Sequence, residues 1–133
     1  PKVANDNCTL SYLGAKSPEQ LFDLYHKSKF LINLSRNESF GLVMTEAMAC
    51  GVPVIATETD GAIEQIKQKK NGFIWKNNDD WLSSNAIDKL NAIFSLSDED
   101  YNNLSFNAVE SAKQHQLSQV CFQIGNLYSQ LTT

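Results

Sequence analysis

The feature that most constrains the fold is a strand, a helix and a second strand, all apolar, packed into residues 30–56. The run Phe30–Leu34 is almost continuously apolar, which is typical of a strand covered on both faces. Residues 42–50 are also apolar almost throughout and stop at Gly51, as expected of a helix buried all round with a glycine at its C-terminus. Val52–Ala56 then predicts another buried strand, with a proline near its start. This order of elements indicates a parallel α/β unit.

Further elements extend the unit on both sides. Ser17, Pro18 and Gln20 predict a capped helix that runs to about Ser28 and buries Leu21, Leu24 and Tyr25, and a short helix is expected from Gly61 to about Lys69. From about residue 79 onward the pattern is helical only, with three apolar stripes: Leu82, Ala86, Leu90 and Phe94; Tyr101, Leu104, Ala108 and Ala112; and seven residues between Leu117 and Leu131. The predicted fold class is therefore α/β: a Rossmann-like parallel sheet of three to four strands flanked by helices, with a helical C-terminal part. Its strands are expected near 8–13, 30–34, 52–57 and 72–75.

Size and composition narrow the possible functions. The 133 residues make one ordinary domain, and 11 basic against 15 acidic residues argue against a nucleic-acid partner. No apolar run approaches the roughly 18 residues that span a bilayer. Three widely spaced cysteines indicate a cytoplasmic protein with no zinc site. Because the first residue is Pro1 rather than Met, we expect a piece of a longer protein.

The loop between the Phe30–Leu34 strand and the next helix is the candidate site. Ligands of open α/β sheets bind at the carboxyl ends of strands, and a helix start offers free backbone N–H groups to an anion. Gly41 has no side chain to block a phosphate, so the amides of Gly41, Leu42 and Val43 are candidate phosphate donors.

Two carboxylates flank this helix start. Glu46 interrupts an otherwise apolar helix, where an ionised group needs a partner, and Glu38 lies in the loop before it. A ligand with hydroxyl groups at both ends and phosphate in the middle, such as a nucleotide sugar, fits this layout. The alternative is that Glu46 pairs with a nearby Lys or Arg.

These residues resemble a known family. Glu38-Ser39-Phe40-Gly41, followed by the run from Glu46 to Ala56, looks like the signature of family 4 retaining glycosyltransferases, which have the GT-B fold and two glutamates separated by seven residues. The resemblance is close over residues 8–80 and looser in the terminal helices. It implies that residues 1–133 are a single partial domain, the nucleotide-sugar-binding half of a GT-B C-terminal domain.

The resemblance also implies a role for each site residue. Glu38 would be the catalytic residue and would hold the donor sugar. Glu46 would hold the ribose hydroxyls. The amides of the helix start would line the sugar and diphosphate, and the segment after Gly14 would lie beside the base; the donor-binding residues are Phe40, Gly41, Leu42, Val43, Glu46, Lys16 and Ser17. Transfer would retain the anomeric configuration without a metal or other cofactor.

The expected function is therefore the donor site of a retaining hexosyltransferase in polysaccharide biosynthesis. Its partners would be a nucleotide-diphosphate sugar and a glycan or lipid-linked acceptor, the latter bound by an N-terminal domain that this chain lacks. The chain alone should bind nucleotide weakly and transfer no sugar. The alternative is a non-catalytic nucleotide-binding or interaction module of the same fold.

Other motifs have simpler interpretations. Asp98-Glu99-Asp100 fits a metal-binding pattern of other glycosyltransferases, but Ser97 before it favours a helix cap. His26 and His115 are expected to be solvated. Lys67–Lys70 is expected to be a solvated helix end, with peripheral contact to acidic lipid at the inner membrane surface as the minor interpretation.

In the family's strand order, residues 8–13 correspond to the third strand and residues 30–34 to the fourth, with two strands between them that are absent here. We therefore expect either that these two segments pair directly or that a sheet edge stays open for another chain.

Overall fold

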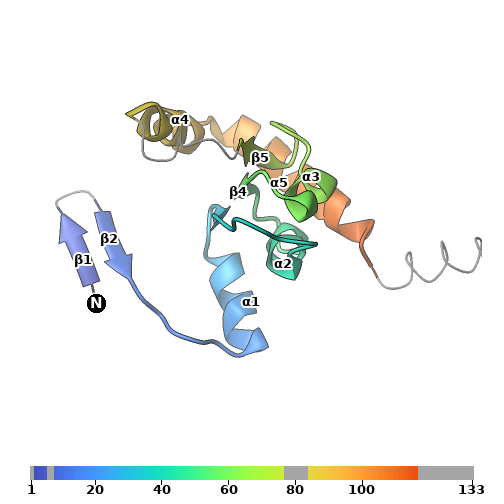
Figure 1. Ribbon diagram of the computed structural model, residues 1–133, viewed down its shortest axis with the longest axis horizontal. Coiled ribbons are helices and arrows are strands. Elements are labelled where there is room, and N and C mark those ends of the chain that lie inside the picture. Colours follow the sequence, from blue (N-terminus) through green and yellow to red (C-terminus); the bar gives the residue numbers. More distant parts are fainter. Residues whose placement is uncertain (1, 6–7, 77–83, 117–133) are drawn as a thin grey trace, which may run out of the picture.

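A computed structural model of the chain describes residues 2–5, 8–76 and 84–116. Figure 1 shows an antiparallel hairpin at the N-terminus, followed by a small parallel sheet with helices around it. The strands are β1 (Lys2–Asn5), β2 (Cys8–Ser11), β3 (Leu31–Asn33), β4 (Val54–Thr57) and β5 (Gly72–Trp75). The helices are α1 (Pro18–His26), α2 (Leu42–Ala49), α3 (Asp60–Gln65), α4 (Ser84–Phe94) and α5 (Asp98–Lys113).

The parallel sheet has the order β3-β4-β5, which confirms the predicted α/β class. Its central strand β4 is buried along its whole length, as its continuous apolar sequence predicts. Ile55 lies opposite Ile32 on one side and Phe73 on the other. Pro53 comes just before the strand, where its carbonyl oxygen accepts a hydrogen bond from the Leu31 amide at 3.1 Å. The sheet therefore places the carboxyl ends of β3 and β4 side by side.

The strand expected at 8–13 does not join this sheet. It forms β2, which pairs antiparallel with β1, and the hairpin stands apart from the rest of the chain in Figure 1. Only two residues separate β1 from β2 in the sequence, so the pairing is local. Direct pairing of residues 8–13 with residues 30–34 was therefore a wrong prediction. Among the described strands, β3 has a partner on one edge only.

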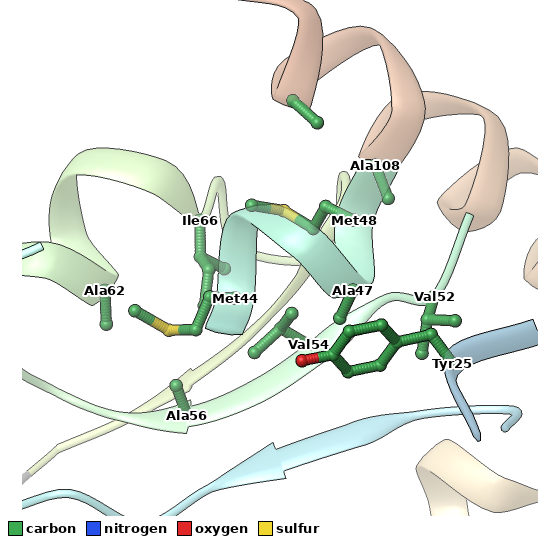
Figure 2. Packing of buried hydrophobic residues seen from close by; sticks show 11 residues of the cluster. Tyr25, Met44, Ala47, Met48, Val52, Val54, Ala56, Ala62, Ile66 and Ala108 are labelled. Carbon is green, nitrogen blue, oxygen red and sulfur yellow. The ribbon is translucent and has the colours of Figure 1, made fainter. Parts of the chain in front are cut away.

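The main core lies around α2. Figure 2 shows the α2 side chains between β4, α3 and α5. Met44, Ala47 and Met48 are completely buried there, and Ala108 of α5 packs against them. The cluster therefore joins α2 to α5. This core sets the position of α2, and α2 begins at the candidate site.

The helix caps follow the sequence. Ser17 and Gln20 form the predicted capping box of α1, with Pro18 as its first residue. The Ser97 side chain accepts a hydrogen bond from the Asp100 amide at 3.1 Å, so Ser97 caps α5 and the acidic run lies in its first turn, as expected.

One helix is shorter than predicted. α3 ends at Gln65, because Ile66 is already extended and the Asn71 side chain takes up the Gln65 carbonyl oxygen. Lys67–Lys70 therefore forms an exposed turn, not a helix end, with Lys69 in the left-handed region at a φ of 61°.

The terminal stripes are confirmed in part. Leu104, Ala108 and Ala112 of α5 are buried, as is Ala86 of α4, whereas Phe94 is 47% exposed and was wrongly placed in the core. Leu82 and the stripe from Leu117 to Leu131 lie outside the described residues. Within the described ranges, none of the helices is both long and apolar enough to cross a membrane.

Candidate functional site

The candidate site lies in the loop 35–41, between the carboxyl end of β3 and the start of α2. Gly41 is the residue that makes this turn. Its φ is 80°, in the left-handed region, and a Cβ there would lie 2.5 Å from the Met44 Cε and 2.8 Å from the Glu38 Cγ. Only glycine fits such a position without strain. Gly41 therefore allows the chain to turn from the loop that carries Glu38 into α2.

The first turn of α2 is open. Gly41 provides no side-chain hydrogen bond to cap it, and Leu42 at the first helical position is 67% exposed. The first amides of a helix have no partner inside the helix, and they carry the positive end of its dipole. The amides of Leu42 and Val43 belong to this open first turn, so they have no hydrogen-bond partner within α2.

Glu38 is half-buried, and its backbone is tied to α3. The Gly61 amide donates to the Glu38 carbonyl oxygen at 3.0 Å. At the start of the loop, the hydroxyl of Thr57, the last residue of β4, donates to the Ser35 carbonyl oxygen. The loop that carries Glu38 is therefore attached to the strand and helix next to it.

Glu46 is exposed, which corrects the expectation of a helix buried all round. Val43 and Ala49 are exposed as well, because α2 covers β4 and α5 with one face only. The partner expected for Glu46 is not a Lys or Arg: the Tyr25 hydroxyl donates to its Oε2 at 3.1 Å.

Tyr25 comes from α1 and is only 7% exposed. Burial, together with the hydrogen bond to Glu46, raises the pKa of Tyr25 to about 12. The hydroxyl therefore stays protonated at neutral pH and can donate only to one carboxylate oxygen, which leaves the other oxygen of Glu46 for a ligand.

Lys16 and Ser17 lie at the opposite end of α1 from Tyr25. Ser17 caps the helix, and Lys16 donates from its ammonium group to the Leu13 carbonyl oxygen. In Figure 1 this end of α1 is the one remote from the sheet. Tyr25 comes eight residues after Ser17 in the sequence, which is about 12 Å along the helix axis. The structure thus brings Glu38, Phe40, Gly41, Leu42, Val43 and Glu46 together around one helix start, with Lys16 and Ser17 farther away.

The structure adds residues that the sequence did not single out. Gln65, at the end of α3, is 2% exposed, and its side-chain amide donates to the Phe40 carbonyl oxygen. His115, expected to be solvated, is half-buried with its ring edge-on to Phe40 at a centroid distance of 5.3 Å. Gln65 and His115 are 25 and 75 residues away from Phe40 in the chain, so no local sequence pattern could reveal these contacts.

Two other features lie outside this site. A cavity of about 870 Å³ lies between β5, α4 and α5, and none of the predicted site residues lines it. Its apolar floor is formed by Phe73, Ile93 and Leu104, which belong to the second core cluster. Among the described residues, no group of three or more His, Cys, Asp or Glu side chains is arranged to hold a metal ion.

The sequence pattern described as glycosyl transferases group 1 matches residues 5–126 of the chain. The chain belongs to the group 1 glycosyl transferases. The match includes the loop 35–41, α2 and every described helix, so the candidate site lies within the family's shared region.

Curated relatives agree with this assignment. The chain is 30% identical over 131 residues to an uncharacterized glycosyltransferase of Methanocaldococcus jannaschii, covering 98% of the chain and 36% of the relative. It is also 30% identical over 124 residues to the D-inositol 3-phosphate glycosyltransferase of Corynebacterium efficiens, covering 93% and 28%. The chain therefore spans about a third of the length of these relatives.

Solved structures confirm the fold. Sucrose-phosphate synthase from Thermosynechococcus elongatus superposes with a TM-score of 0.70 at 29% identity, covering 92% of this chain and 30% of that one. The C-terminal domain of a group 1 glycosyl transferase from Francisella tularensis superposes with a TM-score of 0.60 at 24% identity, covering 79% and 51%. The fold is that of the C-terminal domain of GT-B glycosyltransferases.

Proposed function

We propose that this chain is the donor-binding part of a retaining hexosyltransferase and binds a nucleotide-diphosphate sugar around the start of α2. The observation that supports the proposal is the arrangement of two carboxylates around the open helix start at Gly41. Glu38 lies in the loop before the helix, and Glu46 lies one turn into it. A nucleotide sugar has hydroxyl groups on both sides of a diphosphate and matches this order.

The diphosphate would rest on the amides of Leu42 and Val43, with the amides of Phe40 and Gly41 beside the sugar. The positive end of the α2 dipole stabilises negative charge that grows on the leaving phosphate as the sugar departs. The ribose hydroxyls would donate to the Glu46 oxygen that Tyr25 does not occupy. The base would extend toward Lys16 and Ser17.

Glu38 would hold the sugar hydroxyls and stabilise positive charge at the anomeric carbon. The bond from that carbon to the phosphate oxygen breaks while a bond to the acceptor oxygen forms on the same face, and the acceptor proton goes to the leaving phosphate. This path retains the anomeric configuration, and the contribution of Glu38 is positioning and electrostatics.

The acceptor, a glycan or a lipid-linked glycan, would be bound by an N-terminal domain, since the chain spans about a third of its relatives. We place the longer protein in the cytoplasm, where the exposed Lys67–Lys70 turn is available for peripheral contact with acidic lipid.

Calorimetry with UDP-glucose, GDP-mannose and ADP-glucose tests the donor site. We expect weak, saturable binding of donors with one base, and a loss of about 10- to 100-fold in affinity for Glu46→Ala, because hydrogen bonds to a charged group contribute about 1.5–3 kcal/mol. Glu110→Ala, an exposed carboxylate on α5, is the matched control and should bind as the unmodified chain does.

Two outcomes would contradict the proposal. Absence of saturable binding to all three donors would favour a non-catalytic interaction module. Steady sugar transfer by the 133-residue chain alone would show that it is not merely the donor-binding part.

A further inference from the structure

The loop 35–41 is held at three points by one neighbouring segment of the chain. The Thr57 hydroxyl donates to the Ser35 carbonyl oxygen, the Gly61 amide to the Glu38 carbonyl oxygen at 3.0 Å, and the Gln65 side-chain amide to the Phe40 carbonyl oxygen. The three donors come from the end of β4 and from α3, four residues apart in the sequence. Each takes a backbone carbonyl of the loop, so together they define the path of its main chain.

The third of these contacts also involves α2. Gln65 is 2% exposed, so its amide reaches the loop from inside the protein. Its Oε1 accepts a hydrogen bond from the Thr45 hydroxyl of α2 at 2.7 Å. The side chain therefore joins the start of the site helix to the loop in front of it, with both ends of the amide in use.

Gln65 is itself anchored from behind. Its carbonyl oxygen accepts from the Asn71 Nδ2 at 3.0 Å, and the same nitrogen donates to the Ser111 hydroxyl of α5 at 2.8 Å. Asn71 is fully buried. A continuous set of hydrogen bonds thus runs from α5 through Asn71 and Gln65 to the Phe40 carbonyl.

The loop and α3 lie so close together at Phe40 and Gly61 that no side chain fits between them. A Cβ at Gly61 would lie 2.2 Å from the Phe40 carbonyl oxygen, so the two backbones are in direct contact. A loop residue has no regular hydrogen-bonding pattern to set its peptide planes, and a hydrogen bond to one carbonyl orients the amide that follows it. The Phe40 carbonyl belongs to the peptide whose amide is that of Gly41.

We propose that Gln65 is a positioning residue of the donor site: by holding the Phe40 carbonyl, it aims the Gly41 amide and keeps Glu38 beside the helix start. This inference rests on the proposed function for the identity of the ligand. Gln65 touches no substrate in it and acts only through the loop. Its effect should fall on the diphosphate and sugar, while the ribose, which is expected at Glu46 on α2, should be affected little.

Gln65→Met tests this role, because methionine has a similar length and volume but cannot donate to the Phe40 carbonyl. Ser105→Ala is the matched control. The Ser105 hydroxyl donates to the Gly51 carbonyl oxygen at 2.7 Å, so this variant removes a side-chain-to-backbone bond at the other end of α2.

The first measurement is the NMR backbone order parameter, S², of the purified 133-residue chain without ligand. We expect S² at residues 39–41 to fall from about 0.85 to below about 0.6 in Gln65→Met, with little change at Glu46 and none at the loop in Ser105→Ala. Unchanged order parameters at residues 39–41 would overturn the inference whatever the chain binds.

The second measurement compares the donor that binds best among UDP-glucose, GDP-mannose and ADP-glucose with its own nucleoside monophosphate. Gln65→Met should weaken donor binding about tenfold and monophosphate binding less than twofold. Equal weakening of both ligands would indicate a general structural role and overturn the inference. A loop that loosens in Gln65→Met in a chain that binds none of these nucleotides would support the loop attachment and overturn the proposed function instead.

Discussion

Glu38 and Glu46 lie on either side of the start of α2, but the protein positions them in different ways. Glu38 belongs to an irregular loop whose carbonyls are held by Thr57, Gly61 and Gln65. Glu46 belongs to a regular helix packed on the core, and one hydroxyl, that of Tyr25, orients its side chain. The comparison shows that a helix positions a residue through its own backbone geometry, whereas a loop residue depends on contacts from other segments.

The largest loss of stability is expected from a change next to the loop that carries Glu38. Gly61→Ala places a methyl carbon 2.2 Å from the Phe40 carbonyl oxygen, which forces α3 and the loop apart. We expect a loss of about 3 kcal/mol in the free energy of unfolding, measured by urea denaturation, since overpacking of a filled site costs about this much. Without the contact, Gly to Ala inside a helix would stabilise the protein by about 0.5–1 kcal/mol.

Gly14→Ala separates steric contact from backbone strain. Gly14 also has a positive φ, 66°, but a Cβ there meets nothing within 4 Å. It should cost about 1–2 kcal/mol through strain alone. A stability loss no larger at Gly61 than at Gly14 would show that the close approach of α3 to the loop is unimportant.

A smaller loss of stability is expected from a change at Asn71, which anchors Gln65. Asn71→Ala removes the donor to the Gln65 carbonyl and to Ser111, and the acceptor of the Lys67 amide at 2.7 Å. Because buried groups lose their partners, we expect a destabilisation of about 2–3 kcal/mol in urea denaturation. The NMR order parameters of the loop 35–41 should also fall.

The control for this variant is Asn107→Ala, because among the described residues the Asn107 side chain bonds only to the Asn103 carbonyl within α5. It should change stability by no more than about 0.5 kcal/mol. A loop that keeps its order parameters in Asn71→Ala would mean that Gln65 does not need its anchor.

A change around Glu46, on α2, should reduce stability less than a change around the loop 35–41. Tyr25→Phe keeps the buried ring and removes one hydrogen bond to an exposed carboxylate, so we expect a loss of about 1 kcal/mol in urea denaturation at neutral pH. Order parameters in the loop 35–41 should not change. Tyr12→Phe, at a side chain that is 80% exposed, is the control and should be neutral.

The same variant has a pH signature. The pKa of Tyr25 is raised from 10.0 to about 12 in the folded chain, so between these values the folded protein keeps a proton that the unfolded chain loses. The contribution of Tyr25 to stability is complete below pH 10 and is lost as the pH rises through about 12. The stability of the unmodified chain should therefore fall more steeply above pH 10 than that of Tyr25→Phe; parallel curves would contradict the assignment.

The smallest loss of stability is expected from a change that affects neither the loop 35–41 nor α2. Ser97→Ala removes the cap of α5, which costs about 0.5–1 kcal/mol. Thermal unfolding should show this loss, while the order parameters of residues 38–41 and nucleotide affinity stay unchanged. Altered order parameters at those residues would mean that the loop responds to any loss of stability.

The sequence was sufficient wherever structure depends on neighbouring residues. The α1 capping box, the buried strand β4 and the glycine before α2 are all local patterns, and the structure confirms each of them. Predictions that needed distant contacts were less successful. The strand at 8–13 paired with β1 and not with the sheet, and α3 stopped at Gln65 because Asn71 takes its carbonyl oxygen.

The same distinction between local patterns and distant contacts applies to the candidate site. The sequence alone indicated which residues gather at the start of α2, because Glu38, Gly41 and Glu46 are close in the chain and the α/β pattern sets where a loop follows a strand. Only the tertiary structure decided what holds them: Tyr25 on Glu46, Gln65 on Phe40 and His115 against the Phe40 ring. Backbone hydrogen bonds and apolar periodicity act over a few residues and can be read directly, whereas these contacts join segments 21 to 75 residues apart and exist only once α1, α3 and α5 have packed around α2.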